Sequence, residues 1–153
     1  MYVGGVTPRG LLKYLRTHRL AVQASVSSTG VPQASVVGFV VSDGFEFFFD
    51  ALESARKVMN FRRNSRAALV VGGIEEGEER TAQIEGIADE PKGAELERLK
   101  SIYFARFPDG RERQKWPGLT YFRVRATWIR FSDFSRKPPK VIEFHRDALG
   151  SHG

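Results

Sequence analysis

Apolar residues recur at every second position near the start of the chain. Between residues 20 and 27 they alternate with polar or small residues, and a period of two is typical of a β-strand with one buried face. We therefore expect a half-buried strand here. One face would carry Leu20, Val22, Ala24 and Val26, and the other Ala21, Gln23, Ser25 and Ser27.

Further segments rich in Val, Ile, Leu, Ala or Phe have the composition of strands. They cover residues 33–41, 45–50, 66–73, 80–88 and 120–134. Turn sequences at 28–30 and 42–44 separate the first three strands, which predicts that these three pair in a meander. The continuous apolar run within 66–73 predicts a strand buried on both sides.

The strand at 120–134 is the longest and has two distinct faces. Alternation places Trp128 on the apolar side, so we expect its indole to pack in the core and not to stack on a ligand. The apolar side would carry Phe122, Val124, Ala126 and Trp128, and the other side Tyr121, Arg123, Arg125 and Thr127.

Three segments have the period of a helix. Thr7 and Pro8 suit the cap and first position of a short helix over residues 8–18. Ser54 can cap a second helix over 54–63, and Pro91 opens a third. In the third helix Leu96, Leu99 and Tyr103 share a face, which must lie on a sheet.

The remaining segments are predicted to be irregular. Residues 108–118 have the composition of a polar loop. The Pro138-Pro139 pair is expected to end regular structure, which leaves residues 138–153 as a tail with a frayed end.

Together these elements predict a mostly β fold of the α+β class. Six or seven strands with turn-sized gaps, accompanied by three short helices, suit an antiparallel β-barrel that is closed or nearly closed, because closure removes exposed sheet edges. A chain of 153 residues fits a single domain, residues 1–153, with a sizeable core.

Composition narrows the possible chemistry. The chain has no Cys, which excludes a disulfide scaffold, a thiolate zinc site and a cysteine nucleophile. Its three His residues lack metal-ligand spacing, so no metal site is expected. Because no stretch approaches the ~20 apolar residues of a membrane helix and the start lacks the features of a secretory signal, we expect a cytoplasmic protein with no membrane partner.

The net charge indicates the sign of a partner. The chain has 24 Lys and Arg against 18 Asp and Glu, a net charge of +6, which favours anionic partners. The basic residues are dispersed and form no recognisable nucleic-acid docking motif. We therefore expect a small anionic ligand and no nucleic acid.

The most informative segment is 47–60, where a strand leads into the second helix. Arg56 and Lys57 lie in the first turn of that helix, where free backbone N–H groups and the helix dipole attract anions. Cations there are otherwise mildly unfavourable, so two in succession indicate a bound anion such as phosphate. The alternative is a basic, solvated helix face that also carries Arg62, Arg63 and Arg66.

Four segments have an order and spacing that can be compared with a known family. They are the strand at 20–27, Gly-Val-Pro-Gln-Ala-Ser-Val-Val at 30–37, Ser-Ala-Arg-Lys-Val-Met-Asn at 54–60 and Gln-Ile-Glu-Gly-Ile-Ala at 83–88. In this order they resemble the pyridoxamine 5'-phosphate oxidase-like, FMN-binding split-barrel family, over roughly residues 7–133. The resemblance implies that flavin mononucleotide (FMN) lies in a cleft between the two subunits of a homodimer.

The resemblance also implies roles for particular residues. Arg56 and Lys57 would hold the phosphate of FMN, with Ser54 near it and Asn60 supporting the turn. Ser35, Val36 and Val37 would run along the isoalloxazine ring, and Phe49 and Asp50 would line the ribityl side. Gln83 would reach the cofactor, or it is simply a polar residue on a partly exposed strand face.

The implied activity is that of a flavin-dependent oxidoreductase with a small-molecule substrate. The segment 142–147 does not reproduce the arginine- and histidine-bearing end with which pyridoxamine phosphate oxidases grip their vitamin substrate, so another substrate is expected. Two alternatives stay open: a non-catalytic protein that binds flavin, deazaflavin or haem, and a nucleic-acid binder that uses the positive charge.

Overall fold

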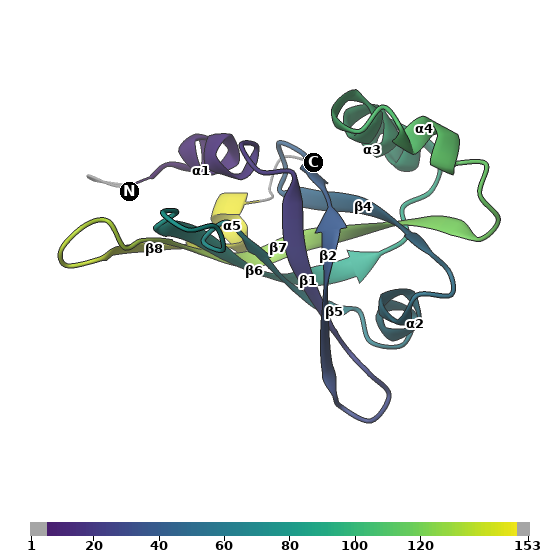
Figure 1. Ribbon diagram of the computed structural model, residues 1–153, viewed down its shortest axis with the longest axis horizontal. Helices are drawn as coiled ribbons and strands as arrows, with labels where there is room; N and C mark the ends of the chain where they lie inside the picture. Colours follow the sequence, from purple (N-terminus) through teal and green to yellow (C-terminus); the bar gives the residue numbers. More distant parts are fainter. Residues whose placement is uncertain (1–5, 150–153) are drawn as a thin grey trace.

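The computed structural model describes residues 6–149, which form one curled antiparallel sheet with helices packed around it (Figure 1). The strands are β1 (Leu20–Val26), β2 (Pro32–Gly38), β3 (Val40–Val41), β4 (Glu46–Leu52), β5 (Arg66–Val71), β6 (Arg80–Asp89), β7 (Leu119–Asp133) and β8 (Lys140–His145). The helices are α1 (Pro8–Leu15), α2 (Arg56–Arg63), α3 (Gly93–Arg106), α4 (Gly110–Arg113) and α5 (Arg146–Leu149).

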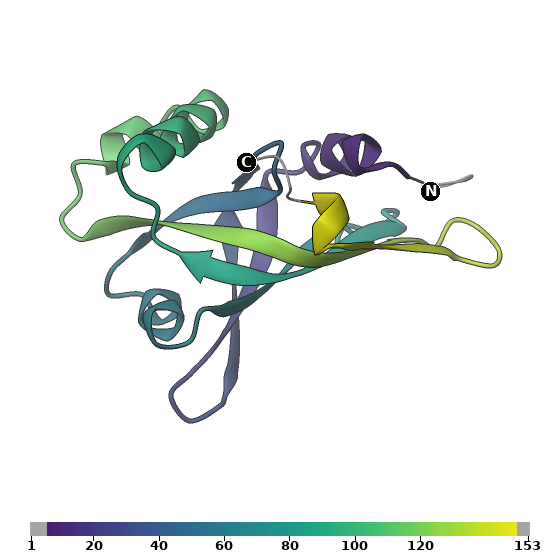
Figure 2. The same cartoon turned by 180° about the vertical axis from the view of Figure 1, so that it is seen from behind.

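The strand order is β2-β1-β5-β6-β7-β4-β3, and β8 pairs with the C-terminal half of β7. The strand predicted over 33–41 is divided at Phe39, so that β2 pairs with β1 and β3 pairs with β4. Because β2 and β3 are consecutive in the chain, the two ends of the sheet meet and the sheet curls into a split barrel, as both views show (Figure 2). The predicted mostly β, α+β split barrel is confirmed. Residues 6–149 contain eight strands against the six or seven predicted, and two one-turn helices, α4 and α5, beyond the three predicted.

The core uses both faces of β4. Successive residues of a strand point to opposite faces, so Phe47 and Phe49 lie inside the barrel whereas Phe48 lies on the outside. Helix α3 covers Phe48, whose ring lies 5.7 Å from the ring of Tyr103. The expectation that the apolar face of the third helix packs on a sheet is confirmed.

Strand β1 buries the opposite face from the one that its alternation suggests. Ala21, Gln23 and Ser25 are buried, whereas Leu20 is 59% exposed. These polar side chains can be buried because Asn60 of α2, which is itself buried, lies against them. Asn60 donates hydrogen bonds to Ser25 of β1 and to Gln33 of β2. As a result the apolar residues of β1 form part of the outer surface of the barrel.

Strand β5 shares this arrangement. Ala67, Leu69 and Val71 are buried in the core, but Ala68 and Val70 on the outer face are partly exposed. The expectation that this strand is buried on both sides is therefore wrong for the described chain, since no helix covers the outer face of β1 and β5 in Figures 1 and 2.

Strand β7 changes face at a β-bulge. Its partner register shifts between Glu85 and Gly86 of β6, which leaves Thr127 as the extra residue. Beyond the bulge Ile129 and Phe131 point into the core, and Trp128 moves to the outer face beside Arg130, 5.5 Å from its guanidinium. The expectation that Trp128 packs in the core is therefore wrong.

The C-terminal segment is also more regular than expected. Beyond the Pro138-Pro139 pair the chain forms β8 and α5, and the side chains of Phe144 and Leu149 are buried in the core. The predicted frayed end, residues 150–153, lies outside the described residues. None of the helices in residues 6–149 is long and apolar enough to cross a membrane.

Candidate functional site

A cavity of about 400 Å3 lies where α2 faces the inner surface of β1 and β2. Its volume is in the range of small-molecule sites. The structure brings together here Ser35, Arg56 and Lys57, which the sequence predicted as cofactor contacts. The described residues that line it are Gln23, Ser25, Gln33, Ala34, Ser35, Arg56 and Lys57.

The two cations of this cavity occupy the first turn of α2, as predicted. Helix α2 begins at Arg56, and its N-cap is Ala55 with no side-chain cap, so the expectation that Ser54 caps the helix is wrong. Lys57 Nζ donates a hydrogen bond of 3.5 Å to Ser35 Oγ, and neither Arg56 nor Lys57 forms an ion pair with any described residue. Arg62, later in the same helix, is by contrast bound by Glu53 and Glu90. The first turn thus offers unneutralised positive charge to an anion.

Buried polar side chains form the floor of the cavity. Asn60 Nδ2 donates to Ser25 Oγ at 3.0 Å and to Gln33 Oε1 at 2.8 Å. Gln23 Nε2 donates to Ser35 Oγ at 2.5 Å. The Oε1 atom of Gln23 is buried and has no partner among the described residues. It is free to accept a hydrogen bond from a ligand N–H or O–H.

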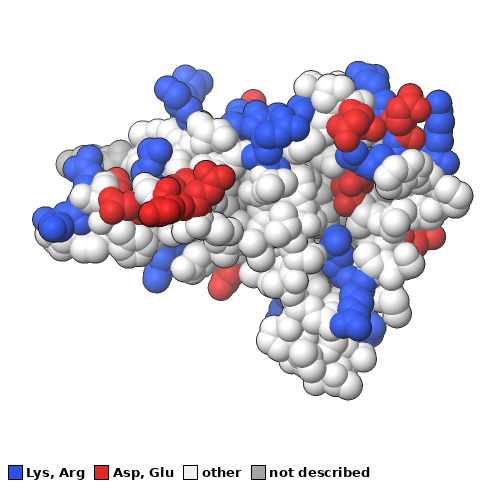
Figure 3. Space-filling model, viewed as in Figure 1, with Lys and Arg blue, Asp and Glu red and all other residues white. Residues whose placement is uncertain are grey.

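Basic side chains also gather on the surface around this cavity. Figure 3 shows Lys and Arg side chains over the region of α2, next to the largely uncharged β1–β2 hairpin. Cations at the opening and uncharged polar groups on the floor suit a ligand with a phosphate at one end and a hydrogen-bonding ring system at the other.

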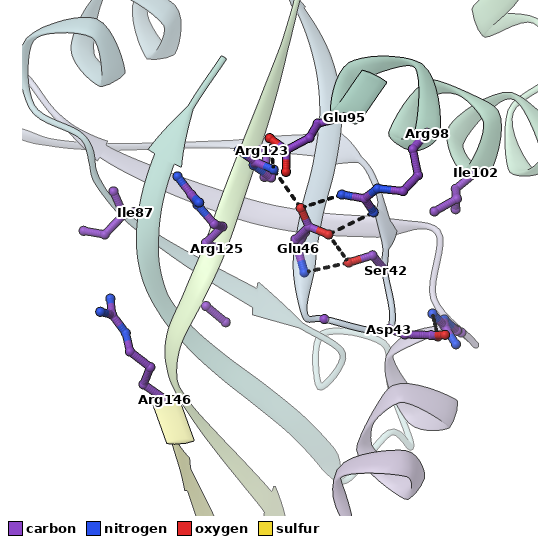
Figure 4. Close-up of a pocket in the computed structure, with 13 residues that line it drawn as sticks. Ser42, Asp43, Glu46, Ile87, Glu95, Arg98, Ile102, Arg123, Arg125 and Arg146 are labelled. Atoms are coloured by element: carbon purple, nitrogen blue, oxygen red, sulfur yellow. Dashed lines mark hydrogen bonds and ion pairs between the residues drawn. The ribbon is translucent and has the colours of Figure 1, made fainter. Parts of the chain in front are cut away.

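A second, larger cavity of about 1100 Å3 lies between the outer face of β7 and helix α3 (Figure 4). Arg123 of β7, which is buried, binds Asp89 through two hydrogen bonds of 2.9 and 2.8 Å and Glu46 at 2.8 Å. Burial raises the pKa of Glu46, but hydrogen bonds from Arg98, Ser42 and Arg123 outweigh burial and lower this pKa to about 2. Glu46 is therefore ionised at neutral pH and forms an ion pair with Arg123 at the wall of this cavity.

Comparison with known families assigns the fold. The pyridoxamine 5'-phosphate oxidase family matches residues 9–133. The chain belongs to this family. No match was found among curated proteins.

Solved structures similar to this family member include proteins with different ligands. A haem-binding protein from Mycobacterium smegmatis has a TM-score of 0.79 at 15% identity, covering 94% of this chain and 60% of that chain. HutZ, the haem storage protein from Vibrio cholerae, has a TM-score of 0.70 at 13% identity, covering 92% and 94%. A pyridoxamine 5'-phosphate oxidase-related FMN-binding protein from Nostoc punctiforme has a TM-score of 0.65 at 12% identity, covering 88% and 86%. At such identities the comparison shows a shared fold, and the chain spans 60% of the length of the mycobacterial protein.

The other residues that the family resemblance implied do not line the first cavity. Val37 and Phe49 are buried in the core, and Val36 is 61% exposed on the outer face of β2. Asp50 accepts a hydrogen bond from Arg113 Nε at 2.8 Å, and Ser54 and Gln83 are exposed. Asn60 lies below the cavity floor, where it joins α2 to β1 and β2. The cofactor roles of Val36, Val37, Phe49, Asp50, Ser54 and Gln83 stay predictions.

Sequence reasoning missed the polar floor of this oxidase-family cavity. Gln23 pairs across the sheet with Ser35, and Ser25 pairs with Gln33. In a hairpin with a short turn these four positions are in register, so two polar residues on each strand indicated a shared polar face. What the alternation could not show is that this polar face is the buried one.

Proposed function

We propose that the protein binds flavin mononucleotide in the cavity between α2, β1 and β2, with the phosphate at Arg56 and Lys57. The observation that carries this proposal is the pair of cations at the start of α2, which have no carboxylate partner within residues 6–149, in the same cavity as the Oε1 atom of Gln23, which has no partner there either. A phosphate would neutralise the cations, and a polar ring edge would satisfy the buried oxygen.

The residues present fit the cofactor chemically. Arg56 provides a planar guanidinium that can hold two phosphate oxygens, Lys57 provides a compact charge, and the first turn of α2 provides backbone N–H groups. Ser35 and Gln23 provide hydrogen-bonding groups along β1 and β2 for the ring system. A bound flavin supplies hydride-transfer chemistry, while the protein supplies binding, orientation and exclusion of water.

On this basis we propose a flavin-dependent oxidoreductase with a small-molecule substrate. Activity would be measured as oxidation of reduced nicotinamide by the FMN-loaded protein with an added electron acceptor. Steady turnover supports the enzyme, whereas a flavin that binds tightly but is never reduced supports the non-catalytic binding protein.

Haem is the second candidate because two similar solved structures carry haem-related names. Haem iron in proteins is held by His, Cys, Met or Tyr side chains. None of the described residues that line the first cavity is of these types. The cavity therefore favours flavin or a deazaflavin over haem, and the absorbance spectrum of the purified protein distinguishes the three.

We also propose that the protein forms a homodimer through the outer face of β1, β2 and β5. Leu20 and Val36 are 59% and 61% exposed on this face, and Val22, Ala24 and Val70 are partly exposed beside them. Contiguous exposed apolar surface is typical of interaction sites, and twofold dimers are the commonest homo-oligomers. Light scattering should give the mass of a dimer for the wild type and of a monomer for Val22→Lys/Val36→Lys, whereas a monomeric wild type at micromolar concentration contradicts the proposal.

The phosphate assignment is tested by titrating apoprotein with FMN. Arg56→Ala/Lys57→Ala should weaken binding by about 3 kcal/mol or more, because each hydrogen bond to a charged group contributes roughly 1.5–3 kcal/mol. Arg63→Ala is the matched control, since Arg63 is an exposed cation in the last turn of the same helix and lies outside the cavity lining. Equal FMN affinity in the double variant and the wild type overturns the assignment.

A further inference from the structure

The cavity between β7 and α3 contains more positive than negative side chains. Five arginines line it, Arg16, Arg98, Arg123, Arg125 and Arg146, together with the carboxylates of Asp43, Glu46 and Glu95. Like charges in one cavity repel each other unless an opposite charge lies between them. The positions of the carboxylates show which of these arginines lack a neutralising partner.

The carboxylates are engaged on one side of β7. Glu46 accepts hydrogen bonds from Arg98, Arg123 and Ser42, as Figure 4 shows. Arg123 also forms an ion pair of 3.3 Å with Glu95. Arg98 and Arg123 therefore already have carboxylate partners, and Arg16 pairs with Asp43 at 2.8 Å.

On the other side of β7, among the described residues, the arginines are not matched by an equal number of carboxylates. Figure 4 shows Arg125, Arg146 and Ile87 there, away from Glu46. Arg125 has 57% of its side chain exposed, and its single ion-pair partner among the described residues is Asp89 at 2.7 Å, which also binds Arg123. Arg146 has no ion pair with any residue in 6–149 and is exposed. Two guanidiniums next to the apolar side chains of Ile87 and Ala126 thus line the same cavity.

We propose that this cavity binds a small organic oxyanion, a carboxylate or a phosphate monoester, whose charge is held by Arg125 and Arg146 and whose apolar part lies on Ile87 and Ala126. Planar guanidiniums suit both kinds of oxyanion because each can donate two parallel hydrogen bonds. The site shares no lining residue with the cavity at α2, so it is separate from the flavin site and does not depend on it.

Calorimetric titration with phenyl phosphate and with benzoate tests the site, and phenol serves as the neutral probe. The wild type should bind at least one of the two anions and not phenol. Stronger binding of phenyl phosphate identifies a phosphate site, and stronger binding of benzoate a carboxylate site. If neither anion binds at millimolar concentration, the proposal is overturned.

Variants distinguish this site from the cavity at α2. Arg125→Gln/Arg146→Gln should weaken anion binding by about tenfold or more, as expected for the loss of charge-assisted hydrogen bonds. Arg146→Gln alone breaks no described ion pair and should also weaken binding, which keeps the test valid if the double variant is unstable. Arg63→Gln is the control, since Arg63 is an exposed cation that lines neither cavity, and this variant should bind the anion as the wild type does. Unchanged anion binding in Arg125→Gln/Arg146→Gln would overturn the proposal, and loss of binding in Arg56→Ala/Lys57→Ala would then place the anion at α2.

Discussion

The amide of Gln23 donates a hydrogen bond of 2.5 Å to Ser35 Oγ, while its own Oε1 stays buried without a partner in the described chain. A buried polar atom without a hydrogen bond costs about 1–3 kcal/mol. In a protein whose α2 also carries two unneutralised cations, this arrangement suits a site that is completed by a ligand.

Replacing Gln23 by leucine should therefore weaken FMN binding without lowering the stability of the fold. In Gln23→Leu the unpartnered oxygen is gone, so the free energy of unfolding in urea should stay the same or rise by about 1 kcal/mol. FMN affinity should fall about tenfold or more, because a ligand hydrogen bond is lost. Gln114→Leu, which changes an exposed amide outside the cavity, should change neither quantity. A Gln23→Leu protein that is destabilised by more than about 2 kcal/mol yet binds FMN normally would mean that the amide is only structural.

Much of the fold could be predicted from periodicity. The strands β1, β2, β4, β5, β6 and β7, the helix starts at Pro8 and near Arg56, and the packing of Tyr103 on a sheet follow from residue spacing alone, whereas β3 and β8 do not. Two features could not, because they depend on partners distant in sequence. One is the face of β1 that becomes buried, which Asn60 of α2 decides, and the other is the bulge that moves Trp128 out of the core.

The bulge itself can be tested at Gly86. A Cβ atom there would lie 2.5 Å from the carbonyl oxygen of Arg125, too close for any real contact with backbone. Gly86→Ala should thus destabilise the protein by about 2–4 kcal/mol in urea unfolding. Gly44→Ala is the matched control, since its Cβ would meet nothing closer than 3.9 Å, and its stability should be within about 0.5 kcal/mol of the wild type. Equal stabilities of the two variants would argue against the close approach of β6 and β7 at this point.

Glu46 should make stability depend on pH. Its pKa is lowered from 4.5 to about 2, so the folded protein binds this proton less readily than the unfolded chain. The resulting stabilisation is complete above about pH 4.5 and is lost as the pH falls towards 2, and it amounts to about 3 kcal/mol. The difference in unfolding free energy between the wild type and Glu46→Gln should therefore be largest at pH 7 and shrink as the pH falls from 4.5 to 2.

An exposed glutamate provides the control for this pH dependence. Glu112 pairs with Lys115 at 3.3 Å on the surface, and both side chains are largely exposed. Glu112→Gln should differ little from the wild type at any pH, because surface ion pairs contribute about 0–1 kcal/mol. A Glu46→Gln difference that stays constant between pH 7 and 2.5 would contradict the assignment of the lowered pKa to Glu46.

The candidate site could be predicted in part. The position of Arg56 and Lys57 at a helix start follows from local sequence, although the cap residue is Ala55 and not the expected Ser54. Ser35 could be placed next to them only through the family resemblance. The network around Arg123 could not be predicted, since its partners Glu46 and Asp89 come from two other strands.

The most direct test of the flavin site compares FMN with riboflavin, which lacks the phosphate. Fluorescence titration of the apoprotein should show that the wild type prefers FMN by about 100-fold or more, as expected for two charged contacts to phosphate. In Arg56→Ala/Lys57→Ala the preference should fall towards one while riboflavin affinity stays unchanged. A wild type that binds both flavins equally, or a double variant that keeps the preference for FMN, would contradict the proposed site.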